Sequence, residues 1–168
     1  MKKLVVVGVA ALAAAVSSAA DVAFPTAGGD LSSAEAWGGA IPTDRALIDK
    51  PGDYTASDDV TLNGFYINIG KNNDATFTVA DDKTVTLNAT LDLYAEQGYN
   101  NITFKGGTWD LTSHAFLPQN GWQDNRRNHY VLTLDGVTVA NATAMSMGYY
   151  SAAGYNRMTE ILYDWQFD

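Results

Sequence analysis

Apolar and polar residues alternate along much of the chain after residue 58, with the two-residue period that is typical of half-buried β-strands. Four segments share a five-residue pattern: an apolar residue, Thr, a second apolar residue, a polar residue, and then Gly or Ala. We call these segments pentads; they are Val60-Thr61-Leu62-Asn63-Gly64, Val85-Thr86-Leu87-Asn88-Ala89, Ile102-Thr103-Phe104-Lys105-Gly106 and Leu132-Thr133-Leu134-Asp135-Gly136. A second alternating run follows each pentad, over residues 65–69, 90–93, 108–111 and 137–139. The pattern predicts repeated strand-turn-strand units, with a further strand at Thr76–Val79.

The spacing of the pentads favours units that stack in one direction. They begin 25, 17 and 30 residues apart, which suits the rungs of a solenoid whose units bury their apolar faces against their neighbours. We therefore predict an all-β fold, a short right-handed parallel β-helix (solenoid) with a capping C-terminal segment. The alternative is an antiparallel β-sandwich, because the Asn-Gly and Asp-Gly pairs of two pentads are also typical of tight hairpin turns.

Stacking in one phase places equivalent side chains of the pentads next to each other. The second positions would then form a single row on the outer face: Thr61, Thr86, Thr103 and Thr133. Asn63 and Asn88 also share one position of the pattern, and we expect a hydrogen bond between their side chains.

The first 20 residues have the organisation of a secretory signal peptide. Lys2 and Lys3 precede an apolar run over Leu4–Val16, and small residues lead to Ala20. We therefore expect export, with cleavage after Ala20. A membrane anchor is disfavoured because the apolar run of 13 residues is shorter than the roughly 20 residues that span a bilayer. A buried core helix is the other alternative.

The rest of the chain divides into three regions. Residues 21–57 are rich in Pro and Gly, and we interpret them as a linker and N-terminal cap in which Trp37 covers an edge of the core. Within this region, Ser32 and Glu35 have the spacing of a helix capping box. Residues 58–143 form the β-helical repeat region. Residues 144–168 break the pattern, and we interpret them as a C-terminal cap or the start of a truncated region.

Charge and cysteine content exclude several classes of function. Removing the leader removes two lysines and no acid, so the formal net charge changes from −9 to −11. A chain this acidic repels phosphate backbones, which argues against nucleic acid as a partner. The absence of cysteine excludes disulfides, zinc–thiolate sites and thiol catalysis. No cofactor is expected.

The long connection from Ser113 to His129 is the candidate binding segment, because loops on a rigid scaffold often carry function. Its aromatic rings offer faces for sugar rings, and its arginines offer donors for sugar hydroxyls. The candidate carbohydrate-binding residues are Trp122, Arg126, Arg127 and Tyr130. The partner would be an extracellular polysaccharide or a cell-surface glycan. The alternative is a solvated loop whose aromatic side chains fold back on the core.

No catalytic or metal-binding motif emerges from the titratable residues. His114 and His129 lack the spacing of a metal site, and we interpret them as surface residues. Glycoside hydrolysis needs two carboxyl groups that face one cleft. Asp58-Asp59 and Asp81-Asp82 do not meet this requirement, because adjacent residues of a strand point to opposite faces. We interpret both pairs as solvated turns.

Three stretches resemble the start of large bacterial surface proteins. They are Gly28-Gly29-Asp30-Leu31-Ser32-Ser33, Trp37-Gly38-Gly39 and Tyr54-Thr55-Ala56-Ser57-Asp58-Asp59-Val60-Thr61. With the leader, they resemble autotransporter-like proteins that carry Thr/Gly/Asn-rich β-helical passenger repeats, and the resemblance extends over most of the mature chain. It implies a secreted or cell-surface structural or adhesive protein. We also expect no membrane span in the mature chain, because no later segment is long and apolar enough to cross a bilayer. A carbohydrate-binding module is the first alternative, and a polysaccharide lyase or glycosidase is the second.

Overall fold

The computed structural model describes residues 20–93, 98–117, 128–145 and 157–167. These residues form strands and turns without a helix, and their strands belong to two sheets in which the neighbouring strands are parallel. The first sheet contains, in spatial order, β1 (Asp21–Ala23), β3 (Arg45–Ile48), β6 (Phe65–Ile67), β9 (Leu91–Leu93), β12 (Ala115–Leu117) and β14 (Ala144–Met145). The second contains β2 (Gly29–Asp30), β4 (Gly52–Ala56), β7 (Asp74–Val79), β10 (Gly98–Lys105), β13 (Asn128–Ala140), β11 (Thr108–Asp110), β8 (Thr84–Leu87) and β5 (Val60–Leu62), and β15 (Arg157–Phe167) pairs with β13.

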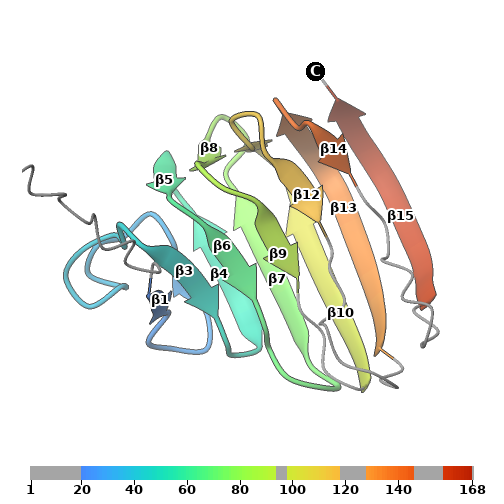
Figure 1. The fold of residues 1–168 in the computed structure, drawn as a ribbon, viewed down its shortest axis with the longest axis horizontal. Helices are drawn as coiled ribbons and strands as arrows, with labels where there is room; N and C mark the ends of the chain where they lie inside the picture. The colour runs from blue at the N-terminus through green and yellow to red at the C-terminus, as the bar shows by residue number, and fades with distance from the viewer. Residues whose placement is uncertain (1–19, 94–97, 118–127, 146–156, 168) are drawn as a thin grey trace, which may run out of the picture.

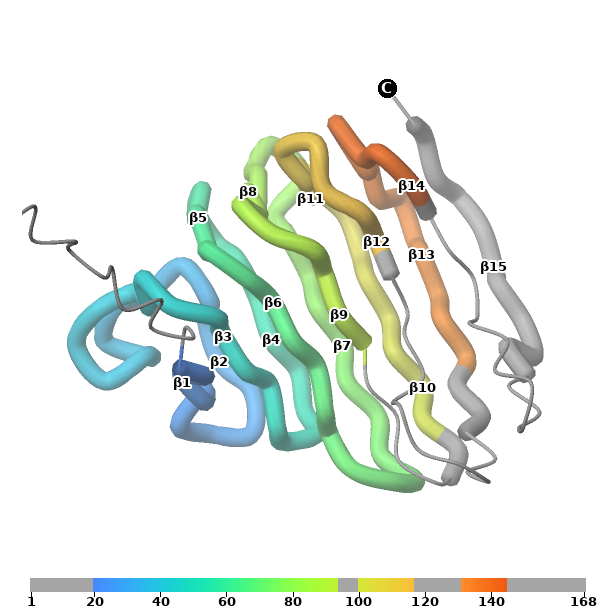
Figure 2. Tube along the Cα trace, in the orientation of Figure 1, coloured from blue at the N-terminus to red at the C-terminus, as the bar shows by residue number. Residues whose placement is uncertain are grey.

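In most pairs of both sheets, a strand pairs with the strand three places further along the chain, whereas neighbours at the ends of the stack differ by two places. Strands β3, β4 and β5 pair with β6, β7 and β8, each in the same order and the same direction. The long strand β13 pairs with β10 through its first half and with β11 through its second half, so that the second sheet curls around (Figure 1). Figure 2 shows β5, β8 and β11 side by side along the upper edge of the view. The predicted all-β class and parallel pairing are confirmed, and the parallel pairs do not support the antiparallel sandwich.

The core lies between the two sheets and is filled from every second position of the strands. In β7, for example, the side chains of Ala75, Phe77 and Val79 are buried, and those between them are not. Phe77 contacts Phe65 of the first sheet, with 5.5 Å between the ring centroids. The period-two pattern therefore forms strands because each strand has one apolar face to bury.

A stack of aromatic rings runs through this core. Tyr54, Phe77 and Phe104 occupy the same register position in β4, β7 and β10. Both neighbouring pairs have ring centroids 5.2 Å apart, with interplanar angles of 13° and 24°. Trp109 meets the edge of this stack, 5.0 Å from Phe104. Parallel register thus converts one aromatic position per unit into a continuous stack.

The four pentads occupy two rows, not one. Thr61 pairs with Thr86 in β5 and β8, whereas Thr103 pairs with Thr133 in β10 and β13. The predicted single row of threonines is therefore wrong. The pentad pattern is typical of any strand that ends at a turn. Each three-strand unit contains more than one strand of this kind, so the pattern alone does not show which strand of the unit a pentad forms.

The expected link between two pentads is present. Asn88 donates from Nδ2 to Oδ1 of Asn63 over 3.1 Å. The two residues follow Leu62 and Leu87, which are register partners in β5 and β8. Equivalent polar residues of stacked units therefore bond to each other along the stack.

The segment interpreted as a linker and N-terminal cap, residues 21–57, holds the four strands β1 to β4. Trp37 is only 7% exposed; its ring lies 4.6 Å from that of Phe24, and its indole N–H donates to the carbonyl of Leu31 over 2.8 Å. The hydroxyl of Ser33 accepts from the N–H of Ala36 over 3.2 Å. The turn is thus capped by Ser33, one residue after the serine that the capping-box spacing predicts.

Several predictions fall on residues that the structure does not describe. The expected leader lies there except for its last residue, and so do parts of the expected C-terminal cap. Of residues 144–168, the described part forms β14 and β15, so the pattern break contains two added strands. Within the described ranges, no helix has the length and apolarity needed to cross a membrane.

Candidate functional site

The described structure does not test the predicted carbohydrate-binding residues. Trp122, Arg126 and Arg127 lie outside the described residues. The backbone of Tyr130 belongs to β13, where it is the register partner of Asn100, and its side chain is outside the described part. The loop site therefore stays a prediction.

His114 and the acid pairs Asp58-Asp59 and Asp81-Asp82 lie in or next to the turns and bends between strands. His114 Nδ1 lies 3.0 Å from the carbonyl oxygen of Leu111. Asp58 forms an ion pair with Lys83 at 3.2 Å, and Asp59 accepts from the backbone N–H of Thr84 over 2.8 Å. Among the described residues, no group of three or more His, Cys, Asp or Glu side chains is placed to hold a metal ion.

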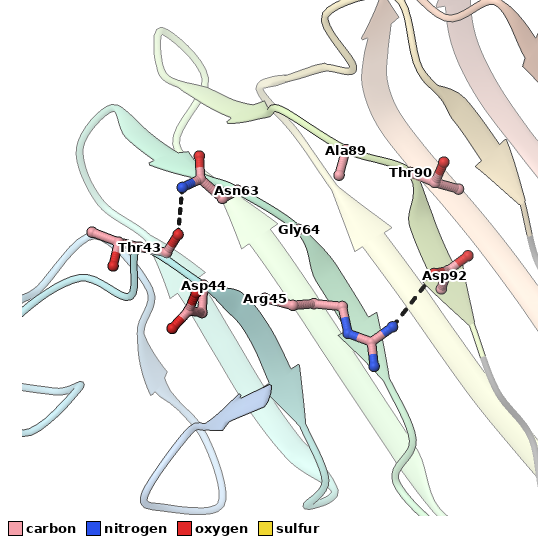
Figure 3. Close-up of a pocket in the computed structure, with 8 residues that line it drawn as sticks. All are labelled: Thr43, Asp44, Arg45, Asn63, Gly64, Ala89, Thr90 and Asp92. Atoms are coloured by element: carbon pink, nitrogen blue, oxygen red, sulfur yellow. Dashed lines mark hydrogen bonds and ion pairs between the residues drawn. The ribbon is translucent and has the colours of Figure 1, made fainter. Parts of the chain in front are cut away.

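A groove of about 460 Å³ lies on the outer face of the first sheet (Figure 3). Its lining comes from β3, from β9, and from the residues just before β3, β6 and β9. The lining residues are Thr43, Asp44, Arg45, Asn63, Gly64, Ala89, Thr90 and Asp92. The alternation of β3 explains why Arg45 reaches this face, because Ala46 and Ile48 are buried whereas Arg45 and Leu47 are only partly buried.

The groove is hollow because Arg45 is followed across the sheet by a residue without a side chain. Ala46 pairs with Phe65, so the position beside Arg45 in the next unit is Gly64. A Cβ atom placed on Gly64 would lie 3.0 Å from Cγ of Arg45, which is closer than ordinary van der Waals contact. The stem of Arg45 therefore lies across Gly64, and the next unit contributes only Thr90 at this level.

Arg45 is held in place from two directions. Its Nε and Nη2 donate to the two carboxylate oxygens of Asp21 over 2.6 and 2.9 Å. Its guanidinium carbon lies 4.6 Å from the ring centroid of Tyr66. The hydrogen bond from Arg45 is the largest cause that holds the pKa of Asp21 below its ordinary value, and burial partly opposes it. A bidentate guanidinium–carboxylate pair fixes direction as well as distance.

Asp92 is the opposite kind of carboxylate. Its side chain is 29% exposed, and its Oδ2 lies 4.0 Å from Nη1 of Arg45. A dashed line in Figure 3 marks this ion pair. This distance is too long for a hydrogen bond, and Arg45 is its one polar partner within the described ranges. Burial raises the pKa of Asp92, with the charge of Arg45 acting against it. Asp92 is thus a partly buried carboxylate that accepts no hydrogen bond from the described residues.

The upper rim of the groove is fixed by Asn63. Its Nδ2 donates to the carbonyl oxygen of Thr43, and its Oδ1 accepts from Asn88. The hydroxyl of Thr90 and the carboxylate of Asp44 have no hydrogen-bond partner in the described part of the chain, and both line the groove. The groove therefore presents a guanidinium donor, carboxylate acceptors and a hydroxyl to a polar ligand.

The sequence patterns do not predict this groove. Arg45 and Asp92 are far apart in the chain and belong to no motif. The one signal in the sequence is that three short strands are similar to each other, and that Arg45 and Asp92 lie at non-buried positions of the first and third. These strands become neighbours only once the units are stacked in register; they are Arg45–Ile48, Phe65–Ile67 and Leu91–Leu93.

The fold and the groove define an all-β protein with parallel sheets and a groove on its first sheet. A scan against protein-family models found no match, and searches of curated proteins and of solved structures found no significant similarity.

Proposed function

We propose that the chain is an exported structural or adhesive protein of the bacterial cell surface, with its units stacked as a short right-handed β-helix. The supporting observation is the parallel pairing of each strand with its counterpart in the next unit. In such a stack each unit buries its apolar face against its neighbours, so rigidity is built along one axis.

Side-chain contacts between units support a structural role. Besides Asn63 and Asn88, Asn101 Nδ2 donates to Asp74 Oδ1 over 2.7 Å, and Asn141 Nδ2 donates to Asp110 Oδ1 over 3.0 Å. Each of these contacts joins residues 25 to 31 positions apart in the sequence. Polar ladders of this kind hold neighbouring units in register in a chain that contains no disulfide.

The leader supports export, and the acidic composition suits an exposed surface that stays soluble. The adhesive part of the proposal draws on the groove, where Thr90 and Asp44 have no hydrogen-bond partner in the described part of the chain. A carbohydrate-binding module is the second candidate function, because the same groove offers both donors and acceptors to a hydroxyl-rich ligand.

The experiment is expression of the full chain with a C-terminal epitope tag in a Gram-negative host, followed by fractionation. We expect the tagged protein outside the cytoplasm, with Asp21 as its first residue by N-terminal sequencing. The matched control is Leu12→Arg, which puts a charge into the apolar run and should leave the chain uncleaved in the cytoplasm. Uncleaved wild-type protein that stays in the cytoplasm would overturn the proposal.

A further inference from the structure

The distance between Arg45 and Asp92 indicates which kind of ligand the groove could bind. Charge-assisted hydrogen bonds between a guanidinium and a carboxylate measure about 2.7–2.9 Å, whereas Nη1 of Arg45 and Oδ2 of Asp92 are 4.0 Å apart. A donor and an acceptor therefore face the same space without bonding to each other. A molecule that contacts both groups must accept a hydrogen bond from Arg45 and donate one to Asp92, which hydroxyl groups can do.

We propose that this groove binds a neutral saccharide through two adjacent ring hydroxyls, one accepting from Arg45 and the other donating to Asp92. Adjacent hydroxyls of a sugar ring supply an acceptor and a donor side by side. The proposal deepens the adhesive role above and rests on it for its biological setting, while its chemistry stands on the groove alone.

Arg45 is preorganised for this contact. Asp21 takes up its Nε and one N–H of Nη2, and the ring of Tyr66 lies under its guanidinium. Nη1 is the guanidinium nitrogen that lies toward Asp92, and it makes no hydrogen bond with Asp21. Holding a donor in its bound orientation lowers the entropy cost of binding.

Asp92 gains more from the ligand than an exposed carboxylate would. It is partly buried and, within the described ranges, accepts no hydrogen bond. A hydroxyl donor would replace the water that burial removes, and satisfying such a group is favourable because an unsatisfied buried acceptor is costly. The hydroxyl of Thr90 lines the same groove and offers a further contact.

The charges around the groove select a neutral ligand. Among the described residues that line the groove, Arg45 is the one cation, and it stands beside Asp44 and Asp92 and is already paired with Asp21. A uronate or phosphate would meet this excess of negative charge as well as the net charge of the chain, −9 with the leader included. The volume of about 460 Å³ falls within the range of roughly 300–1,000 Å³ that is usual for ligand sites.

The test is native affinity electrophoresis of the purified chain in gels that contain a polysaccharide. The neutral probes are glucan, mannan, galactan and xylan, which present different diol stereochemistries, and the acidic probe is polygalacturonate. We expect at least one neutral polymer, but not polygalacturonate, to slow the protein. Retardation by polygalacturonate would overturn the proposal. So would the absence of retardation by every neutral polymer, provided that a thermal melt shows that the protein is folded.

Variants locate the site. Asp92→Asn keeps the shape of the side chain and removes the charged acceptor, and we expect it to weaken binding at least tenfold with an unchanged melting temperature. The matched control is Asp53→Asn, which makes the same charge change at an exposed position of β4 away from the groove and should bind like wild type. Equal binding by the two variants would exclude the groove as the site.

Gly64→Ala provides a second, uncharged test. The added methyl group would press on the stem of Arg45 and should weaken binding several-fold by moving the guanidinium. Failure of binding and failure of export are separable. An exported chain that binds no polymer keeps the structural role, and a chain that binds but is not exported keeps the site and loses the surface role.

Discussion

The inside and the outside of the stack use the same register in opposite ways. Inside, Tyr54, Phe77 and Phe104 repeat one kind of side chain in successive units, and the rings stack. Outside, the residue changes from Arg45 to Gly64 between neighbouring units, and the surface hollows. Repetition at a register position builds the core, whereas its interruption builds the groove. The difference teaches that the scaffold and the candidate site come from one arrangement of strands.

The largest expected effect is on the repeated side. Phe77→Ala removes the middle ring of the aromatic stack, which contacts rings on both sides and Phe65 across the core. We expect a loss of about 3–5 kcal/mol in the free energy of unfolding, as for other buried aromatic residues, measured by urea denaturation. Thr78→Ala, at the exposed neighbouring position of β7, should stay within about 0.5 kcal/mol of wild type. A similar loss from both variants would contradict the inside–outside distinction.

Two glycines sharpen the same comparison. Gly107 and Gly136 both have positive φ, 55° and 63°. A Cβ on Gly107 would lie 2.3 Å from Cγ1 of Val79, whereas a Cβ on Gly136 would meet nothing within 4 Å. Gly136→Ala should therefore cost only the backbone strain of about 1–2 kcal/mol, and Gly107→Ala should cost clearly more. Thermal melts of the two variants measure the difference, and equal melting temperatures would show that the clash is absent.

The smallest effects concern the two carboxylates that face Arg45. The pKa of Asp21 is lowered, so its contribution to stability is present above the ordinary value of 3.8 and lost as the pH falls through the folded-state pKa. The pKa of Asp92 is raised, so its contribution is present below 3.8 and lost as the pH rises through its folded-state pKa. The two groups therefore oppose each other on acidification.

Asparagine variants separate these contributions. At pH 7, Asp21→Asn should lower stability by about 0.2–1 kcal/mol, the usual range for an exposed ion pair. Asp92→Asn should leave stability unchanged or slightly higher, because the ionised carboxylate is the disfavoured form there. Urea denaturation at pH 7 and below pH 3.8 tests both, and the loss from Asp21→Asn should shrink at the lower pH. A clear destabilisation by Asp92→Asn at pH 7 would contradict the description of Asp92.

The sequence was sufficient for the strands and for part of their stacking. The period-two alternation located the strand at Thr76–Val79, which lies within β7, and the shared pattern position predicted the bond between Asn63 and Asn88. The sequence did not separate the two rows of threonines. A pentad indicates a strand followed by a turn, whereas the row to which its threonine belongs depends on the number of residues in each unit.

The groove could not be predicted from the sequence, for a physical reason. Its donor and acceptor, Arg45 and Asp92, meet only through the registers of β3, β6 and β9. Its hollow depends on what Gly64 lacks, and a single glycine after an asparagine is read first as a turn residue. The predicted loop residues, Trp122 among them, stay a separate prediction.

The most direct test of the stacking is cross-linking in a chain that has no natural cysteine. Parallel neighbours lie about 4.8 Å apart, within the Cα distance that a disulfide spans. Thr61→Cys with Thr86→Cys joins register partners, and we expect this pair to oxidise to a disulfide and lose its reaction with a thiol reagent. Thr86→Cys with Thr103→Cys joins neighbours of the single predicted row, and this pair should keep two free thiols. A disulfide in the second pair but not in the first would contradict the observed register and the groove that depends on it.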